Sequence, residues 1–198
     1  MLGAQYTFKT ESMPDYDEKL PNCLIFGDSV SIGYERAVKE RLRGKCNVQH
    51  SPWDVSNGGW GSSSAALTCL DNALLSAAAE PLVTSANRGK TIIFFNNGLH
   101  NTQNNSTQAI LQYKDDISNI AKTFQTLHPF RLFYGLTTPL MTSYNAGDQI
   151  IEKLNAQALD AMQSLGIPAV DLYARVLEKC AAPGEKSYVD CPICATLS

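Results

Sequence analysis

The chain alternates short apolar runs with longer segments in which apolar residues recur every three or four positions. A short apolar run closed by turn residues is typical of a buried strand, and the longer period is typical of an amphipathic helix. We therefore expect strands over residues 22–27, 46–51, 91–96, 131–139 and 167–173. We expect helices over 31–44, 62–79, 107–127 and 148–165, and a short helix that reaches Cys180.

This alternation predicts an α/β protein in which helices cover both faces of a parallel sheet. Residues 1–20 are polar and irregular, and we expect them to form an arm. Residues 21–198 are expected to form one domain, which ends in an irregular segment that contains cysteines. A length of 198 residues, 44% of them hydrophobic, suits a single compact core.

Charge and hydropathy narrow the classes of partner. The formal net charge of −3 gives no reason to expect nucleic acid. No apolar run approaches the ~18 residues of a membrane span, so we expect no span. No basic segment followed by an apolar one is visible at the N-terminus, so no signal peptide is predicted. We expect a small-molecule partner, no metal and no cofactor.

Polar residues follow the predicted strands where a parallel sheet places its functional loops. The first strand ends in Gly27-Asp28-Ser29, where Ser29 is either a helix cap or a nucleophile. Loop 57–64 contains three glycines, which let a backbone N–H approach a ligand closely. Loop 96–101 carries amide and imidazole donors. Such donors beside a hydroxyl would form an oxyanion hole.

These motifs, in this order, resemble the SGNH/GDSL hydrolase superfamily over roughly residues 21–175. The resemblance implies a three-layer α/β/α sandwich with a flavodoxin-like sheet and a serine ester hydrolase that acts on a small or carbohydrate-linked ester. Gly27-Asp28-Ser29 matches the first block, which implies Ser29 as nucleophile. Gly61 is the best match to the second-block glycine that serves the oxyanion, and Gly59 is the second choice.

The third block of the superfamily is normally Gly-x-Asn-Asp, and here it reads Gly98-Leu99-His100-Asn101. The stretch 95–101, FNNGLHN, is closer to a branch with the pattern F-N-x-G-L-H-D. The resemblance implies that Asn96 or His100 completes the oxyanion hole beside Gly61. Asp28, Gly98 and Asn101 are expected to support the site.

The chain departs from the superfamily at its general base. Members end with an Asp-x-x-His block, but the histidines here are His50, His100 and His128. Asp190 is a candidate for the acid of that block, and no histidine follows it. Two interpretations stay open. In one, the base lies on polypeptide beyond Ser198. In the other, the protein is an inactive SGNH-like scaffold that serves as a binding module or a subunit of a larger assembly.

Six cysteines leave disulfides, free thiols, and metal or redox chemistry as alternatives. Cys23 and Cys46 each precede or begin a predicted strand, so a bridge between them is geometrically feasible. Cys69 lies in an apolar pattern and is expected to be a buried thiol. We expect Cys180 to pair with Cys191 or Cys194. Two overlapping sequons at Asn104 and Asn105 favour a secreted or lumenal protein.

Overall fold

The computed structural model describes residues 16–17, 19–51, 60–75, 90–126, 131–139 and 145–180 of the chain. The strands are β1 (Asn22–Phe26), β2 (Asn47–Ser51), β3 (Ile92–Phe95), β4 (Arg131–Gly135) and β5 (Ala169–Val170). The helices are α1 (Ser29–Leu42), α2 (Ser63–Leu75), α4 (Thr107–Thr126), α5 (Asn145–Ser164) and α6 (Leu172–Cys180), and η3 (Leu99–Asn101) is a 3-10 turn.

The five strands form one sheet in the order β2-β1-β3-β4-β5, and every neighbouring pair is parallel. This confirms the expected flavodoxin-like α/β/α sandwich. The chain leaves β1 toward β2 on one side and returns to β3 on the other, so the strand order reverses between β1 and β3. In open parallel sheets, ligands bind beyond the carboxyl ends of the strands at such a reversal.

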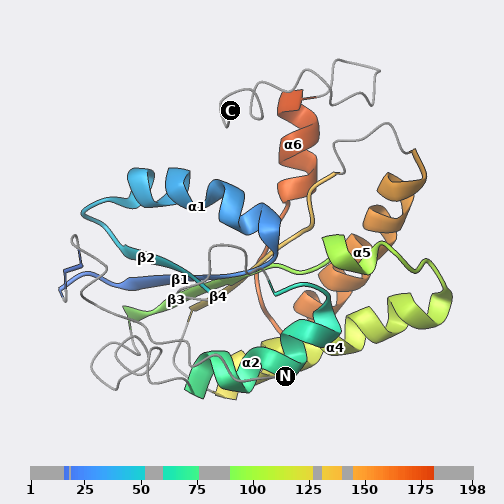
Figure 1. The fold of residues 1–198 in the computed structure, drawn as a ribbon, viewed down its shortest axis with the longest axis horizontal. Helices are drawn as coiled ribbons and strands as arrows, with labels where there is room; N and C mark the ends of the chain where they lie inside the picture. The colour runs from blue at the N-terminus through green and yellow to red at the C-terminus, as the bar shows by residue number, and fades with distance from the viewer. Residues whose placement is uncertain are drawn as a thin grey trace.

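The larger core lies between the sheet and helices α2, α4 and α5, which cover one face (Figure 1). Alternate residues of the central strands, such as Leu24, Phe26, Ile93 and Phe95, point into it because successive side chains of a strand face opposite sides. Phe124 of α4 packs among aromatic rings, with centroids 5.0 Å from Phe26, 5.2 Å from Phe95 and 6.2 Å from Trp60.

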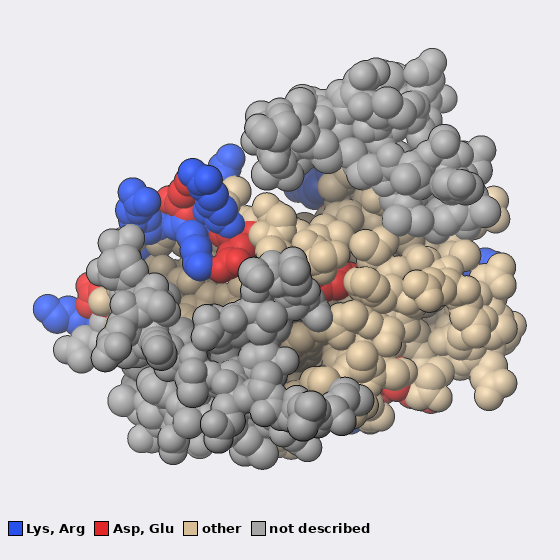
Figure 2. All heavy atoms as spheres, in the orientation of Figure 1, with Lys and Arg blue, Asp and Glu red and all other residues tan. Residues whose placement is uncertain are grey.

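The opposite face is covered by α1, and α6 also lies on this side (Figure 1). Its core is smaller: Ile25 and Val48 of the sheet pack against Tyr34, Val38 and Leu42, which recur every four residues along α1. The outer side of α1 is charged, and the Lys and Arg side chains gather over it (Figure 2). The pairs Arg36–Glu40 and Lys39–Glu35 connect successive turns there.

Several element boundaries differ from the sequence prediction. Helix α1 begins at Ser29 rather than at residue 31, because Asp28 caps it. The strand expected over 131–139 ends at Gly135, and of the strand expected over 167–173 only Ala169–Val170 pairs. Both of these strands lie toward one edge of the sheet, and β5 has β4 as its only neighbour among the described strands.

The structure decides between disulfide and free thiol for some of the six cysteines. Cys23 and Cys46 form a disulfide, with their Cα atoms 6.0 Å apart. Cys180 is also disulfide-bonded, and its partner lies outside the described residues, as do Cys191 and Cys194. Cys69 is a free thiol, but the expectation that it is buried is wrong. Helix α2 buries Ala66 and Leu70 instead, and Cys69 falls on its exposed side.

Among the described residues, no helix has the length and apolarity required to cross a membrane.

Candidate active site

Three loops meet beyond the carboxyl ends of β1 and β3. The N–H of Trp60 donates to the carbonyl of Gly27 at 2.9 Å, and the N–H of Asn96 donates to the carbonyl of Phe26 at 2.8 Å. The side-chain amide of Asn97 donates to the carbonyl of Gly61 at 3.2 Å. The segments that carry Ser29, Gly61 and His100 are therefore fixed to one another by hydrogen bonds at the reversal point of the sheet.

Ser29 is the first residue of α1, and its side chain is exposed. The helix cap is Asp28, whose Oδ1 accepts a hydrogen bond from the N–H of Val30 at 3.0 Å. The Ser29 hydroxyl makes no hydrogen bond to any described residue. Of the two roles that the sequence left open for Ser29, the capping role therefore belongs to Asp28.

The Asp28 side chain is buried, and its Oδ2 has no hydrogen-bond partner among the described residues. Burial raises the pKa of this carboxyl above its ordinary value of 3.8, because the loss of water outweighs the hydrogen bond from Val30 and the charge of His100.

Gly61 has a φ of +65°, a conformation that glycine adopts readily. The segment after it is held by Asn101, whose Oδ1 accepts from the N–H of Ser63 at 3.1 Å and whose Nδ2 donates to the Ser63 hydroxyl at 2.9 Å. Asn101 thus connects the third-block segment to the first turn of α2. Gly59, the second choice for the oxyanion glycine, lies outside the described residues.

Asn96 and Gly98, in the loop after β3, are both buried. The Asn96 amide donates to the carbonyl of Gly135 at 2.6 Å, which uses one of its two N–H groups. A Cβ atom at position 98 would lie 2.1 Å from the Thr137 hydroxyl oxygen, so only glycine fits there. His100, by contrast, is exposed. Between Asn96 and His100, the imidazole is therefore the more accessible donor.

Sequence reasoning missed the role of Asn97. Its backbone carbonyl accepts hydrogen bonds from three buried hydroxyls, Tyr134 at 2.8 Å, Tyr113 at 2.9 Å and Thr137 at 3.2 Å. Burial is the main cause that raises the pKa of Tyr134 to about 12, so these phenols stay protonated donors. Tyr113 lies on the apolar face of α4 and resembles a core residue in the sequence, because its hydroxyl leaves no trace in the periodicity.

Of the other two histidines, only His50 lies among the described residues, and it contacts Ser31. His50 is buried in β2, and its Nε2 lies 2.5 Å from the hydroxyl of Ser31, which in turn donates to the carbonyl of Asp28 at 2.6 Å. Its pairing with Ser31 stabilises the turn below Ser29 and was not anticipated. His128 lies outside the described residues.

A hollow of about 240 Å³ lies beside His100 and Asn101, between the η3 loop and the first turns of α2 and α4. The buried Asp116 lies on its wall and accepts hydrogen bonds from the hydroxyls of Ser63 at 2.9 Å and Ser64 at 2.6 Å. Ser29 and Gly61 are not among the described residues that line it. The hollow therefore adjoins the three loops rather than enclosing the serine.

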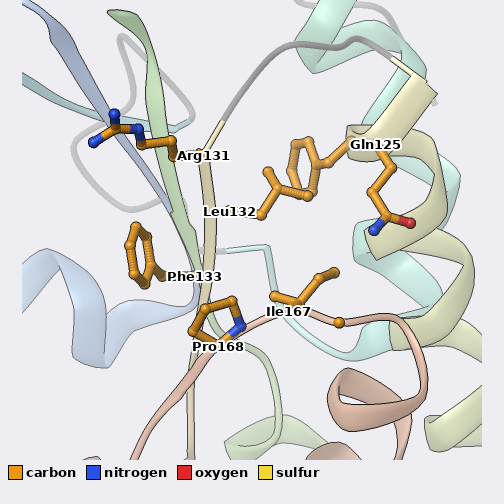
Figure 3. A pocket seen from close by; sticks show the side chains of 8 residues that line it. Gln125, Arg131, Leu132, Phe133, Ile167 and Pro168 are labelled. Carbon is orange, nitrogen blue, oxygen red and sulfur yellow. The ribbon is translucent and has the colours of Figure 1, made fainter.

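A second hollow, of about 330 Å³, lies at the opposite edge of the sheet, where β4 begins. Figure 3 shows Arg131 and Phe133 on one side of the strand, and Leu132 with Ile167 on the other. It contains none of the candidate site residues, so we do not assign it to the site.

Solved structures with a similar fold include esterases and lipolytic proteins. The acetyl xylan esterase AlAXEase is 11% identical, covers 80% of each chain and has a TM-score of 0.61. A lipolytic G-D-S-L family member from Veillonella parvula is 16% identical over 83% of this chain and 84% of its own, with a TM-score of 0.60. A lipase/acylhydrolase from Enterococcus faecalis is 16% identical over 90% and 93%, with a TM-score of 0.57.

By sequence alone, no protein-family model and no curated protein matches the chain significantly. The similarity to these structures is therefore one of fold.

Proposed function

We propose that this chain, which has the fold of the SGNH/GDSL hydrolases, is a serine ester hydrolase with Ser29 as its nucleophile. The observation that carries the proposal is the state of Ser29. It begins a helix at the reversal point of the sheet, it is exposed, and Asp28 performs the capping in its place. A hydroxyl at that position that makes no hydrogen bond to any described residue is available for chemistry.

In the proposed reaction, the Ser29 oxygen attacks the acyl carbon of an ester, and a base takes the serine proton. The N–H groups of Ser29 and Gly61 and the imidazole of His100 donate to the oxyanion that forms. The ester C–O bond then breaks, and the alcohol leaves with a proton. Water attacks the acyl-serine, releases the carboxylic acid and restores the hydroxyl.

A second candidate function is that of a non-catalytic binding protein on the same scaffold. The sequence observation that favours it is the base: no histidine of these 198 residues has the position of the Asp-x-x-His block. Asn101, in place of the third-block acid, is occupied with the first turn of α2. The two candidates differ in whether Ser29 can react at all.

The test adds imidazole to the solution as an external base. Without a paired base, turnover of short-chain nitrophenyl esters by the 198-residue chain should be about 10⁴–10⁶ below that of a complete triad. Added imidazole should raise this rate saturably in the parent chain but not in Ser29→Ala. Ser118→Ala, a serine that donates to its own helix, serves as the matched control and should behave as the parent. The uncatalysed reaction of imidazole with each ester is subtracted in parallel.

Two outcomes would contradict the proposal or part of it. Equal rates in the parent chain and Ser29→Ala at every imidazole concentration would favour the binding protein. Robust turnover without imidazole, abolished by Ser29→Ala, would keep the hydrolase but show that a base lies within these 198 residues.

The role of His100 is tested by two replacements. If His100 donates to the oxyanion, His100→Asn should retain most of the imidazole-rescued rate, because an amide N–H reaches a similar position. His100→Ala should lose about 10²–10³-fold, the usual effect of one missing oxyanion donor. Equal losses in both variants would indicate that the imidazole acts as a base instead.

A further inference from the structure

Asp116 of α4 carries a buried carboxyl group that the proposed reaction does not use. The residue is 3% exposed, and it forms no ion pair with any described residue. Its Oδ2 accepts hydrogen bonds from the hydroxyls of Ser63 at 2.9 Å and Ser64 at 2.6 Å, and its Oδ1 accepts from the Gln112 amide at 2.8 Å. A buried carboxyl group is costly without such donors, so these three contacts fix Asp116 and its partners to one another.

Two of the three donors are the first residues of α2. The N–H groups in the first turn of a helix have no partner within the helix, and Asn101 Oδ1 supplies one for the N–H of Ser63 at 3.1 Å. The Ser63 hydroxyl accepts from Asn101 Nδ2 at 2.9 Å while it donates to Asp116. Asp116, Ser63 and Asn101 therefore form a continuous chain of hydrogen bonds from α4, through the start of α2, to the η3 loop.

Gly61, the candidate oxyanion glycine, lies two residues before this chain of hydrogen bonds. Its φ is +65°, and glycine reaches other φ values at little cost, so its own backbone does not fix the direction of its N–H. The Asn97 amide binds the Gly61 carbonyl at 3.2 Å, which orients the peptide group after the glycine and not the N–H before it. The direction of that N–H therefore depends on how the chain is held on either side.

The chain is held on both sides of Gly61. On the side of β1, the N–H of Trp60 donates to the carbonyl of Gly27 at 2.9 Å. On the side of α2, Ser63 is bound to Asp116 and to the η3 loop. Without Asp116, the Ser63 hydroxyl would lose its acceptor, and the start of α2 would lose its connection to α4 through this group.

We propose that Asp116 is a positioning residue: by fixing Ser63, it fixes the direction of the Gly61 N–H toward the oxyanion. The inference rests on the proposed function in one respect, since this N–H serves an oxyanion only if Ser29 reacts. Oxyanion donors lower a reaction barrier because they are in place before the charge forms. A displacement of about 1 Å in the groups of an active site can cost about 10²-fold in rate.

The test variants separate the hydrogen bonds of Asp116 from its place in the fold. Asp116→Asn retains an oxygen that accepts from both serines, and its NH₂ group donates to the Gln112 carbonyl oxygen once that exposed amide turns over. Asp116→Ala removes every acceptor. Ser63→Ala interrupts the chain of hydrogen bonds at its middle, and it decides the question if Asp116→Ala does not fold. Asp115→Ala is the matched control, because Asp115 is exposed on the same helix and makes no hydrogen bond to a described residue.

The first measurement is the ¹⁵N order parameter of the Gly61 backbone N–H, which requires no turnover. We expect the value of rigid backbone, about 0.85, in the parent chain, in Asp116→Asn and in Asp115→Ala. In Asp116→Ala and in Ser63→Ala it should fall below about 0.6, the range of flexible backbone. The order parameters of α5, which carries none of these residues, should not change, whereas a general loss of the fold would lower them too.

The second measurement is the imidazole-rescued hydrolysis by Ser29. Asp116→Ala should lower kcat about 10- to 100-fold and change KM less than about 2-fold, because the oxyanion forms only in the transition state. Asp116→Asn should recover most of that loss. A role in stability alone would lower the free energy of unfolding of Asp116→Ala and leave the kcat and KM of the folded protein unchanged.

Three results would overturn the inference. The first is a Gly61 order parameter in Asp116→Ala and Ser63→Ala that equals that of the parent. The second is a loss in Asp116→Asn as large as that in Asp116→Ala, and the third is an unchanged kcat in Asp116→Ala when the parent responds to imidazole. Expected order parameters without any imidazole-rescued hydrolysis would refute the hydrolase and keep the fixing of Gly61, so the two failures are distinguishable.

Discussion

At position 28 a carboxyl group is buried at the start of α1, where one oxygen accepts from Val30 and the other has no partner among the described residues. The helix N-terminus favours a negative charge, but the loss of water disfavours it more, so the pKa is raised. The folded state thus prefers the neutral carboxyl more than the unfolded state does.

We therefore expect Asp28→Asn to gain stability over the parent chain as the pH rises. Below the ordinary pKa of 3.8, both the folded and the unfolded parent carry a neutral carboxyl, and the difference should be smallest. As the pH rises through the raised folded pKa, the parent loses the stability that its neutral carboxyl contributed, whereas the amide does not titrate. Urea unfolding from pH 3 to 7 measures this.

Asp115→Asn, a change at an exposed position of α4, is the control, and its difference from the parent should vary less with pH. A difference for Asp28→Asn that is constant or falls with pH would show that the carboxyl is stabilised as an anion.

At this scale the sequence placed Asp28 and Ser29 at the start of a helix but did not decide their individual tasks. Asp28 and Ser29 are both good capping residues, and only the backbone geometry decides between them. Asn97 acts through its carbonyl, which every residue type possesses, so no pattern could reveal it. Cys69 was misassigned because the apolar side of a helix is narrower than the apolar stretch of sequence that encodes it.

At the scale of elements, the Cys23–Cys46 disulfide joins β1 to the end of the α1–β2 connection. It closes a loop with a sequence separation of 23, which contributes about 2–4 kcal/mol on the chain-entropy model. We expect the double variant Cys23→Ala/Cys46→Ala to lose that amount in urea unfolding. Cys69→Ala, at a free and exposed thiol, should change stability by less than about 0.5 kcal/mol.

If the double variant unfolded at the same urea concentration as the parent, the disulfide would contribute nothing measurable to the free energy of unfolding. Reduction of the parent is a poorer test, because Cys180 also forms a disulfide.

The elements were predictable where the hydrophobic pattern is long and regular. Helix α4 was expected over 107–127 and extends from Thr107 to Thr126, because its buried face repeats over five turns. The extent of the last strand was not predictable, since only Ala169–Val170 pairs with β4. Ile167 is buried in the larger core without belonging to the strand, and apolarity alone does not separate a core residue from a strand residue.

At the scale of the whole molecule, Phe124 joins the sheet to the helical layer below the site. Its ring contacts Phe26, Phe95 and Trp60, and Trp60 precedes the candidate oxyanion glycine. Phe124→Ala should cost about 3–5 kcal/mol, because a fully buried ring leaves a cavity that the layer cannot close. The neighbouring Thr123→Ala, at a half-buried position, should cost less than about 1 kcal/mol.

Thermal or urea unfolding checks both changes. A loss below about 1 kcal/mol for Phe124→Ala would mean that the larger core can repack around the gap.

The arrangement of the molecule followed from its sequence because alternating strands and helices leave few topologies. The convergence of the three loops followed as well, since all of them come after strands of one parallel sheet. The hollow beside His100 did not, because its wall combines side chains from α2, α4 and the η3 loop that share no pattern along the chain.

Because Asp28 caps α1, the side chain at position 29 has no part in holding the helix. Capping of α1 therefore places no requirement on the hydroxyl at position 29. The same freedom makes position 29 a suitable point of attachment: a cysteine placed there would accept a fluorophore or spin label at the mouth of the site. Such a label would report on changes around position 29 while α1 stayed capped by Asp28.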